Sequence, residues 1–93
     1  MTIGLLRIEF ILPEINSLKE KRSIIQRIKN KVRDEFNVSS AELEYLDRQR
    51  KALIGFATLS NDSNIPEQIL TNIEEFIDKR YNILVTDRKI ELF

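Results

Sequence analysis

The sequence of 93 residues contains no cysteine, no histidine and no tryptophan, and it has only two glycines and two prolines. Without cysteine and histidine, the chain cannot form a Ser-His-Asp or Cys-His catalytic site, a zinc finger, a His-ligated haem or a disulfide framework. Acid-base chemistry would have to use carboxylates, lysine or tyrosine alone. The glycines are isolated at positions 4 and 55, so there is no glycine-rich phosphate loop. We expect no enzymatic activity, no cofactor, no metal site and no small-molecule substrate.

Long hydrophobic runs are also missing. The longest uncharged stretch, Ala52 to Asn61, has ten residues, whereas a membrane span needs about 20. Arg7 and Glu9 interrupt the apolar N-terminal run, which therefore lacks the form of a signal peptide. At 42% hydrophobic and 32% charged residues, the chain is too apolar to be disordered. The sequence predicts one cytoplasmic domain over residues 1–93, with no membrane contact.

Hydrophobic periodicity predicts four strands and two helices. In the first strand, Leu6, Ile8 and Phe10 alternate on one face, and Pro13 ends the strand because proline cannot donate to a β-ladder. The predicted elements are a strand over 2–12, a helix over 17–36, strands over 38–46 and 51–59, a helix from about 65 to 80, and a strand over 83–93.

This βαββαβ order is that of the α+β ferredoxin-like fold. Right-handed crossovers would place both helices on one face of a four-stranded antiparallel sheet. Numbered along the chain, the strands would take the order 4-1-3-2. The other face of the sheet would be left open.

The first helix begins with a capping box, in which Ser17 is the N-cap and Glu20 reaches back from the third helical position. Asn37 is the predicted stop, because asparagine tolerates the left-handed conformation. Lys21 falls within the apolar stripe, and we interpret it as snorkelling to solvent; an anion site shared with Arg22 is the alternative. The stripe comprises Leu18, Ile25, Ile28, Val32 and Phe36, and that of the second helix comprises Ile65, Ile69, Ile73, Phe76 and Ile77.

A net charge of zero hides a polarised distribution. Residues 17–36 carry seven cations against three acids, a net charge of +4, and residues 61–80 carry two cations against five acids, a net charge of −3. These two helices should lie side by side on the sheet. The basic face of the first helix could therefore be solvated and paired with its acidic neighbour, in pairs of little energetic weight.

The alternative interpretation of the basic helix is functional. Arg22, Gln26, Lys29 and Arg33 recur at helical spacing and form one row beside the apolar stripe. Such a row can follow a phosphate backbone and release counterions at each contact. The candidate nucleic-acid-binding residues are Lys19, Arg22, Lys29 and Arg33, with Arg27 and Lys31 as secondary contributors.

The open sheet face predicts a partner. Apolar residues on both faces of central strands usually mean that both faces are covered, and the chain has no third layer of its own, so we expect a homodimer. An RNA-recognition motif would instead place aromatic residues on this face, and the run from Gly55 to Leu59 provides only the first of them. A small-molecule site between dimer sheets is a further alternative. The candidate dimer or partner face consists of Ile3, Leu5, Arg7, Glu9, Ile11, Ile54 and Phe56.

Two groups of carboxylates could in principle hold Mg²⁺, which prefers oxygen ligands. Glu42 and Glu44 are expected on one face of the second strand, and Glu74, Glu75 and Asp78 lie on the second helix. We interpret both groups as solvated or ion-paired.

Several segments resemble the YlxP-like bacterial family of unknown function. They include the run SLKEKRS over 17–23 and the run FNVS over 36–39 at the matching distance. In the turn before the third strand, Gln49 or a neighbour stands where the family has an aromatic tryptophan. The remaining matching segments are Leu6–Glu9, Leu12-Pro13, Ala41-Glu42 and Ser60–Asp62.

The resemblance implies a ferredoxin-like fold and a small bacterial cytoplasmic protein. Members of the family are often encoded beside translation initiation and ribosome-maturation factors, which suggests an accessory role in ribosome assembly or translation. We predict a non-enzymatic, dimeric accessory protein that binds a ribosomal subunit or structured RNA through the first helix. The alternative is a dimeric protein-interaction or regulatory module that uses the open sheet face.

Overall fold

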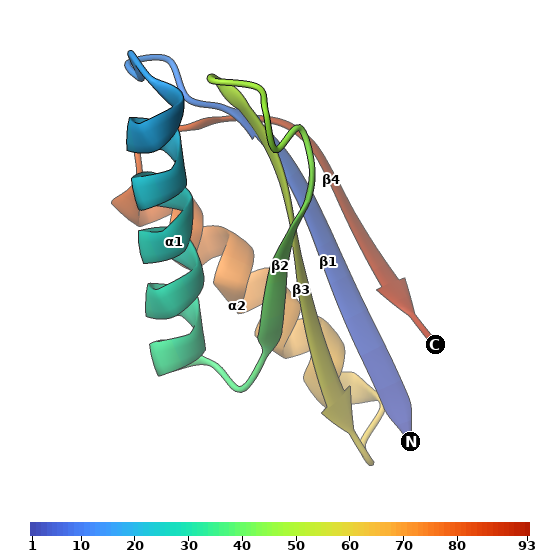
Figure 1. Ribbon diagram of the computed structural model, residues 1–93. Helices are drawn as coiled ribbons and strands as arrows, with labels where there is room; N and C mark the ends of the chain where they lie inside the picture. The colour runs from blue at the N-terminus through green and yellow to red at the C-terminus, as the bar shows by residue number, and fades with distance from the viewer.

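A computed structural model describes residues 1–93 and has the predicted βαββαβ order (Figure 1). Each observed element lies within two residues of its predicted bounds. The elements are β1 (Thr2–Ile11), α1 (Leu18–Glu35), β2 (Ser39–Glu44), β3 (Lys51–Ser60), α2 (Asn64–Arg80) and β4 (Leu84–Leu92).

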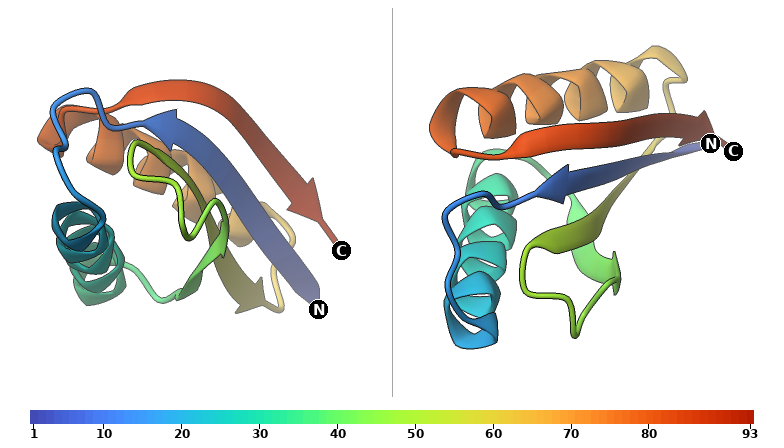
Figure 2. Two further views of the ribbon diagram at one scale, coloured as in Figure 1. Left: turned by 45° about the horizontal axis from the view of Figure 1, so that its top comes forward. Right: turned by 90° about the horizontal axis from the view of Figure 1, so that it is seen from above.

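The four strands form one antiparallel sheet in the order β2-β3-β1-β4, which confirms the predicted ferredoxin-like topology. Both helices lie on the same side of this sheet, and the other side is uncovered (Figures 1 and 2). β1 is central and pairs along nearly its whole length with both β3 and β4. Neither helix is long and apolar enough to cross a membrane.

The core lies between the sheet and the two helices. Leu6, Ile8 and Phe10 of β1 point into it, as predicted. Their cross-strand partners on β3 are Phe56, Ile54 and Ala52, and directly opposite residues share a face of the sheet. The helices contribute Ile25, Ile28 and Val32 of α1 and Leu70, Ile73 and Ile77 of α2.

The assignment of Ile54 and Phe56 to the open face was therefore wrong. Both side chains are fully buried in the core, at 0% exposure. Alternation could not decide their direction because β3 is apolar or small at almost every position. The register with β1 decides it, and places Leu53 and Gly55 on the open face instead.

α1 begins as predicted. The Ser17 hydroxyl accepts a hydrogen bond from the Glu20 backbone N–H at 3.1 Å, and the Glu20 carboxylate accepts one from the Asn16 N–H at 3.3 Å. The predicted left-handed stop at Asn37 is wrong, since α1 ends in extended backbone at Phe36, and Tyr45 is the only non-glycine residue with positive φ.

The buried side of α2 is rotated from its predicted position. It consists of Pro66, Leu70, Ile73 and Ile77, while Ile65 is exposed. The helix approaches β1 closely because Gly4 has no side chain: a Cβ atom there would lie 2.8 Å from Pro66 Cβ. Gly4 therefore allows the first turn of α2 to pack directly on the sheet.

β2 contains a bulge between Glu42 and Glu44, since these two residues oppose consecutive residues, Ile54 and Leu53, of β3. A bulge adds one residue and reverses the alternation beyond it. Glu42 thus shares the helix-covered face with Ile54, and Glu44 lies on the open face. The expectation that both carboxylates share one face was wrong, so they do not form a joint cation site.

Candidate nucleic-acid interface

Lys21 fixes how α1 sits on the sheet. Its side chain is completely buried, and Nζ donates to the Tyr45 carbonyl oxygen at 2.6 Å and lies 2.9 Å from Glu42 Oε2. Tyr45 has φ of 65°, in the left-handed region that residues other than glycine rarely adopt. The prediction that Lys21 snorkels to solvent is therefore wrong. The ammonium group stays inside the fold because the end of β2 supplies an ionic partner and a carbonyl there.

The turn between β2 and β3 is also tied to the segment before α1. Gln49 Nε2 and Arg50 Nε both donate to the Ile15 carbonyl oxygen, at 3.2 and 3.0 Å. Gln49 stands near the position where the family resemblance leads us to expect tryptophan. Here its amide takes part in holding the start of α1 against the sheet.

With Lys21 directed inward, the predicted basic row of α1 points outward. The row of Arg22, Gln26, Lys29 and Arg33 covers eleven residue steps, which is about 16 Å along the helix axis. All six candidate cations are exposed except Lys29, which is half-buried. Arg33 and Gln26 both donate to Asn30 Oδ1, so the side chains of the row are partly ordered before any ligand binds.

None of the six candidate cations of α1 forms an ion pair. The salt bridges of the structure are Lys21–Glu42, three pairs within the sheet and one pair between α2 and β4, and no cation of the row takes part. Among the acids of α2, Glu74 is paired with Arg88 of β4 and not with α1. The structure therefore does not contain the ion pairs between α1 and α2 that this alternative requires.

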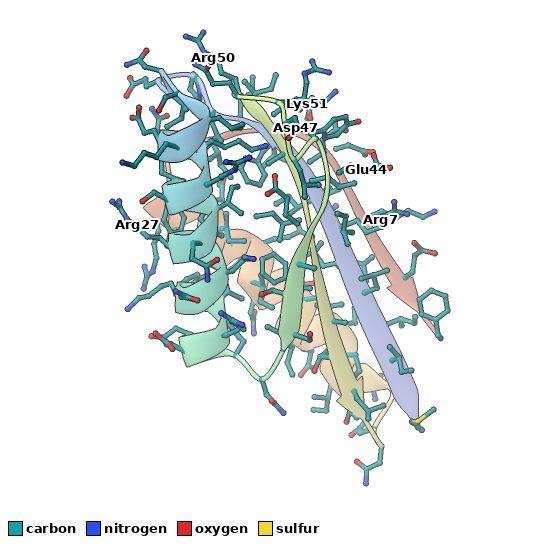
Figure 3. All side chains as sticks on the ribbon, in the orientation of Figure 1. Arg7, Arg27, Glu44, Asp47, Arg50 and Lys51 are labelled. Atoms are coloured by element: carbon teal, nitrogen blue, oxygen red, sulfur yellow. The ribbon has the colours of Figure 1, made fainter.

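The six cations occupy two flanks of α1. Successive residues turn by about 100° around a helix, which separates Arg27 and Lys31 from the row that contains Arg22, Lys29 and Arg33. Figure 3 shows Arg27 on the side of α1 away from β2. It lines a cavity together with Arg80 and Tyr81 at the end of α2. The secondary contributors thus form a second basic flank.

The open face carries most of the predicted partner residues. Arg7 and Glu44 project from the sheet away from the helices (Figure 3). Ile3, Leu5 and Ile11 alternate with the buried residues of β1 and so lie on the same open face. At the end near both termini, Ile3 lies between Leu59 of β3 and Phe93, giving an exposed apolar row across three strands.

Glu9 is the centre of a polar cluster on this face. Its carboxylate accepts hydrogen bonds from the Tyr45 hydroxyl at 3.1 Å and the Thr86 hydroxyl at 2.7 Å, and Lys51 Nζ lies 4.0 Å away. The Thr86 hydrogen bond lowers the pKa of Glu9 below its ordinary value of about 4.5, Tyr45 and Lys51 lower it further, and desolvation opposes them. Sequence patterns could not reveal this cluster, because a bulge in β4 brings Thr86 to Glu9.

Comparison with known proteins finds a matching family model, a curated relative and matching solved structures. A family model described as "Protein of unknown function (DUF503)" matches residues 3–90. The uncharacterized protein YlxP of Bacillus subtilis (strain 168) is 35% identical over 91 residues, which cover 98% of this chain and 99% of that protein.

One of the matching solved structures belongs to an enzyme domain. The apo form of LarC2, the C-terminal domain of a cyclometallase involved in the synthesis of the NPN cofactor of lactate racemase, aligns with a TM-score of 0.41 and 8% identity. The alignment covers all of this chain and 56% of that one, so the chain spans about half the length of that domain.

We predict that Lys21→Ala lowers the free energy of unfolding by about 3 kcal/mol, because it leaves Glu42 and the Tyr45 carbonyl without their buried partner. Urea unfolding measures this loss. Lys19→Ala, which removes an exposed lysine from the same helix, should change it by less than about 0.5 kcal/mol. The double variant Lys21→Met/Glu42→Leu should recover much of the loss, and equal effects of Lys21→Ala and Lys19→Ala would contradict the prediction.

The Glu9 cluster predicts a pH dependence. Since the pKa of Glu9 is lower in the folded than in the unfolded chain, its stabilisation is complete above the unfolded pKa and is lost as pH falls through the folded pKa. Thr86→Val should raise the pKa of Glu9 toward its ordinary value. An NMR titration of the Glu9 carboxyl carbon measures the shift, with Thr71→Val on α2 as the control. An unchanged pKa in Thr86→Val would show that this hydrogen bond is not the main cause.

Proposed function

The chain belongs to the DUF503 family of proteins of unknown function, and within that family we propose that it is a non-enzymatic accessory protein that binds structured RNA through the basic face of α1. The match to YlxP also confirms the YlxP-like resemblance of the sequence. Because neither match comes with a known activity, the proposal rests on this chain's own surface.

The observation that carries the proposal is that six cations on one helix have no carboxylate partner. When a binding partner covers an exposed cation, the cation loses its contact with water and counterions. This is unfavourable unless the partner supplies an anion. RNA offers a regular series of phosphates, and each neutralised phosphate releases counterions. The row of Arg22, Lys29 and Arg33 is long enough to meet several phosphates of one strand. Binding along α1 would therefore depend on shape and charge.

The setting that we propose for this RNA is the ribosome. The family resemblance links such proteins to genes for translation and ribosome maturation, and ribosomal subunits present structured RNA at high density. No catalytic role is assigned to any residue. The protein would act by occupying an RNA surface during assembly or translation.

We predict that Arg22→Ala/Lys29→Ala/Arg33→Ala weakens binding to ribosomal subunits and flattens its salt dependence by up to about three phosphate contacts. The measurement is co-sedimentation with ribosomal subunits at roughly 50 and 300 mM salt, because phosphate-driven binding falls steeply over this range. Fluorescence anisotropy with a labelled RNA hairpin gives the slope.

A pair of charge-matched variants controls for net charge. Arg22→Ala/Arg33→Ala and Arg48→Ala/Lys79→Ala each remove two exposed cations, and only the first pair belongs to the row. The first should weaken binding, and the second should leave it nearly unchanged. Equal losses of affinity in the two double variants would show that binding depends only on overall charge. Binding of the triple variant at wild-type strength would refute the assignment of the row.

A second candidate function rests on a different observation, namely that the open sheet face is uncovered and exposes the row of Ile3, Leu59 and Phe93. We propose that a second copy of the chain covers this face. With strands about 4.8 Å apart and a rise of about 3.3 Å per residue, the face offers roughly 600 Å² per copy, enough for the ~1,000 Å² total of a specific interface.

The charges of the open face fit a twofold contact. Arg7 lies opposite Lys89, and the neighbouring pair along the strands is Glu9 and Asp87. Two copies related by a twofold axis bring the same surface together. The basic pair of one copy can then meet the acidic pair of the other.

We predict that the protein elutes as a dimer and that Leu59→Lys makes it monomeric. Leu59 is 61% exposed, so the change should not disturb folding of the single chain. Light scattering coupled to size-exclusion chromatography measures the mass, and Ile65→Lys, on α2 and away from the sheet face, is the control. A monomeric wild type, or a dimer that survives Leu59→Lys, would contradict this interface.

A further inference from the structure

A cavity of about 280 Å³ opens where α1 begins and α2 ends. It lies between the segment before α1, the first turns of α1 and the connection from α2 to β4. Leu12, Ile15, Ile24 and Ile83 supply an apolar lining. Its volume lies just below the usual range of ligand pockets, so the cavity suits one small planar group.

Two arginines stand at this cavity, and they come from different helices. Arg27 belongs to the second basic flank of α1, and Arg80 lies in the last turn of α2. The Arg80 guanidinium lies 4.1 Å from the centre of the Phe76 ring, which holds it in place. Neither arginine forms a salt bridge. An anionic ligand could therefore be contacted by both.

The cavity also contains polar groups that can read the edge of a planar ring. Its polar lining offers the hydroxyl of Tyr81, the amide of Asn82 and the carboxylates of Glu14 and Glu20. Tyr81 is partly buried, and desolvation raises the pKa of its phenol above the ordinary value of about 10, while the charges of Arg80 and Arg27 oppose this. The hydroxyl is thus a neutral donor and acceptor.

We propose that this cavity receives one unpaired base of the RNA bound along α1, with Arg27 and Arg80 contacting the phosphates on either side of that nucleotide. Arg27 connects the cavity to the basic helix, which is why the occupant would come from the same RNA. Proteins that recognise RNA often hold a splayed-out base against aromatic or arginine side chains. This inference rests on the proposed function and adds a preference for RNA with a bulged or looped-out nucleotide.

The test compares two RNA hairpins of equal length, one fully paired and one with a single bulged 2-aminopurine. By fluorescence anisotropy, the wild type should bind the bulged hairpin about tenfold more tightly, the gain expected from burying one stacked base. The emission of 2-aminopurine should also change on binding. Ile83→Trp fills the cavity. This variant should lose the preference and bind both hairpins with the affinity that the wild type has for the fully paired hairpin.

Leu46→Trp, which adds an indole to the exposed turn after β2, is the matched control and should keep the tenfold preference. Asn82→Ala provides a second, smaller change at the cavity and should reduce the preference while leaving the melting temperature unchanged. Equal binding of both hairpins by the wild type would overturn this inference and leave the proposed function standing. Failure to bind either hairpin would overturn the proposed function itself.

Discussion

The buried ammonium group of Lys21 is the constraint on which the rest of the surface depends. A charged group without water must be paired, and here the partners are Glu42 and the carbonyl of Tyr45 at the end of β2. Meeting this requirement fixes the rotation of α1 about its own axis. Once Lys21 points inward, Arg22, Lys29 and Arg33 must face solvent on one flank, and Arg27 must face the cavity on the other. A single buried charge thus determines where the exposed charges are presented.

Tyr45 links the two faces of the sheet. Its left-handed backbone turns the carbonyl oxygen toward Lys21 on the helix side, while its hydroxyl reaches Glu9 on the open side. Lys51 Nζ lies 4.4 Å from the centre of the same ring. The strained conformation persists because both ends of the residue are bound. Tyr45 therefore makes contacts on both faces of the sheet. Its conformation depends on the contact with Lys21 on one face and the contact with Glu9 on the other.

Sequence patterns predicted what depends on local chemistry. The capping box located the start of α1, the alternation of Leu6, Ile8 and Phe10 located the core face of β1, and the element order implied the strand order.

The errors arose where the register between strands, or a contact between distant residues, decides the structure. Ile54 and Phe56 lie in a strand that is apolar on both faces, and the bulge after Glu42 cannot be read from spacing. Lys21 looked like a snorkelling lysine because its partner lies 21 residues further along the chain. The helical spacing indicated a basic row beside the apolar stripe, but only the structure could show that α2 forms no ion pair with it.

β1 has a further consequence for how the chain acquires its structure. It is the central strand, and it pairs with β3 and with β4, so that Ile3 exchanges backbone hydrogen bonds with Phe93. Contacts between such distant residues slow folding, since a long loop must close before they form. During synthesis, the edge of β1 that will meet β4 stays unpaired until nearly all of these residues have left the ribosomal tunnel. The chain without β4 is therefore a partly formed sheet in which one edge of β1 has no hydrogen-bond partner. We expect this species to be the most prone to aggregation.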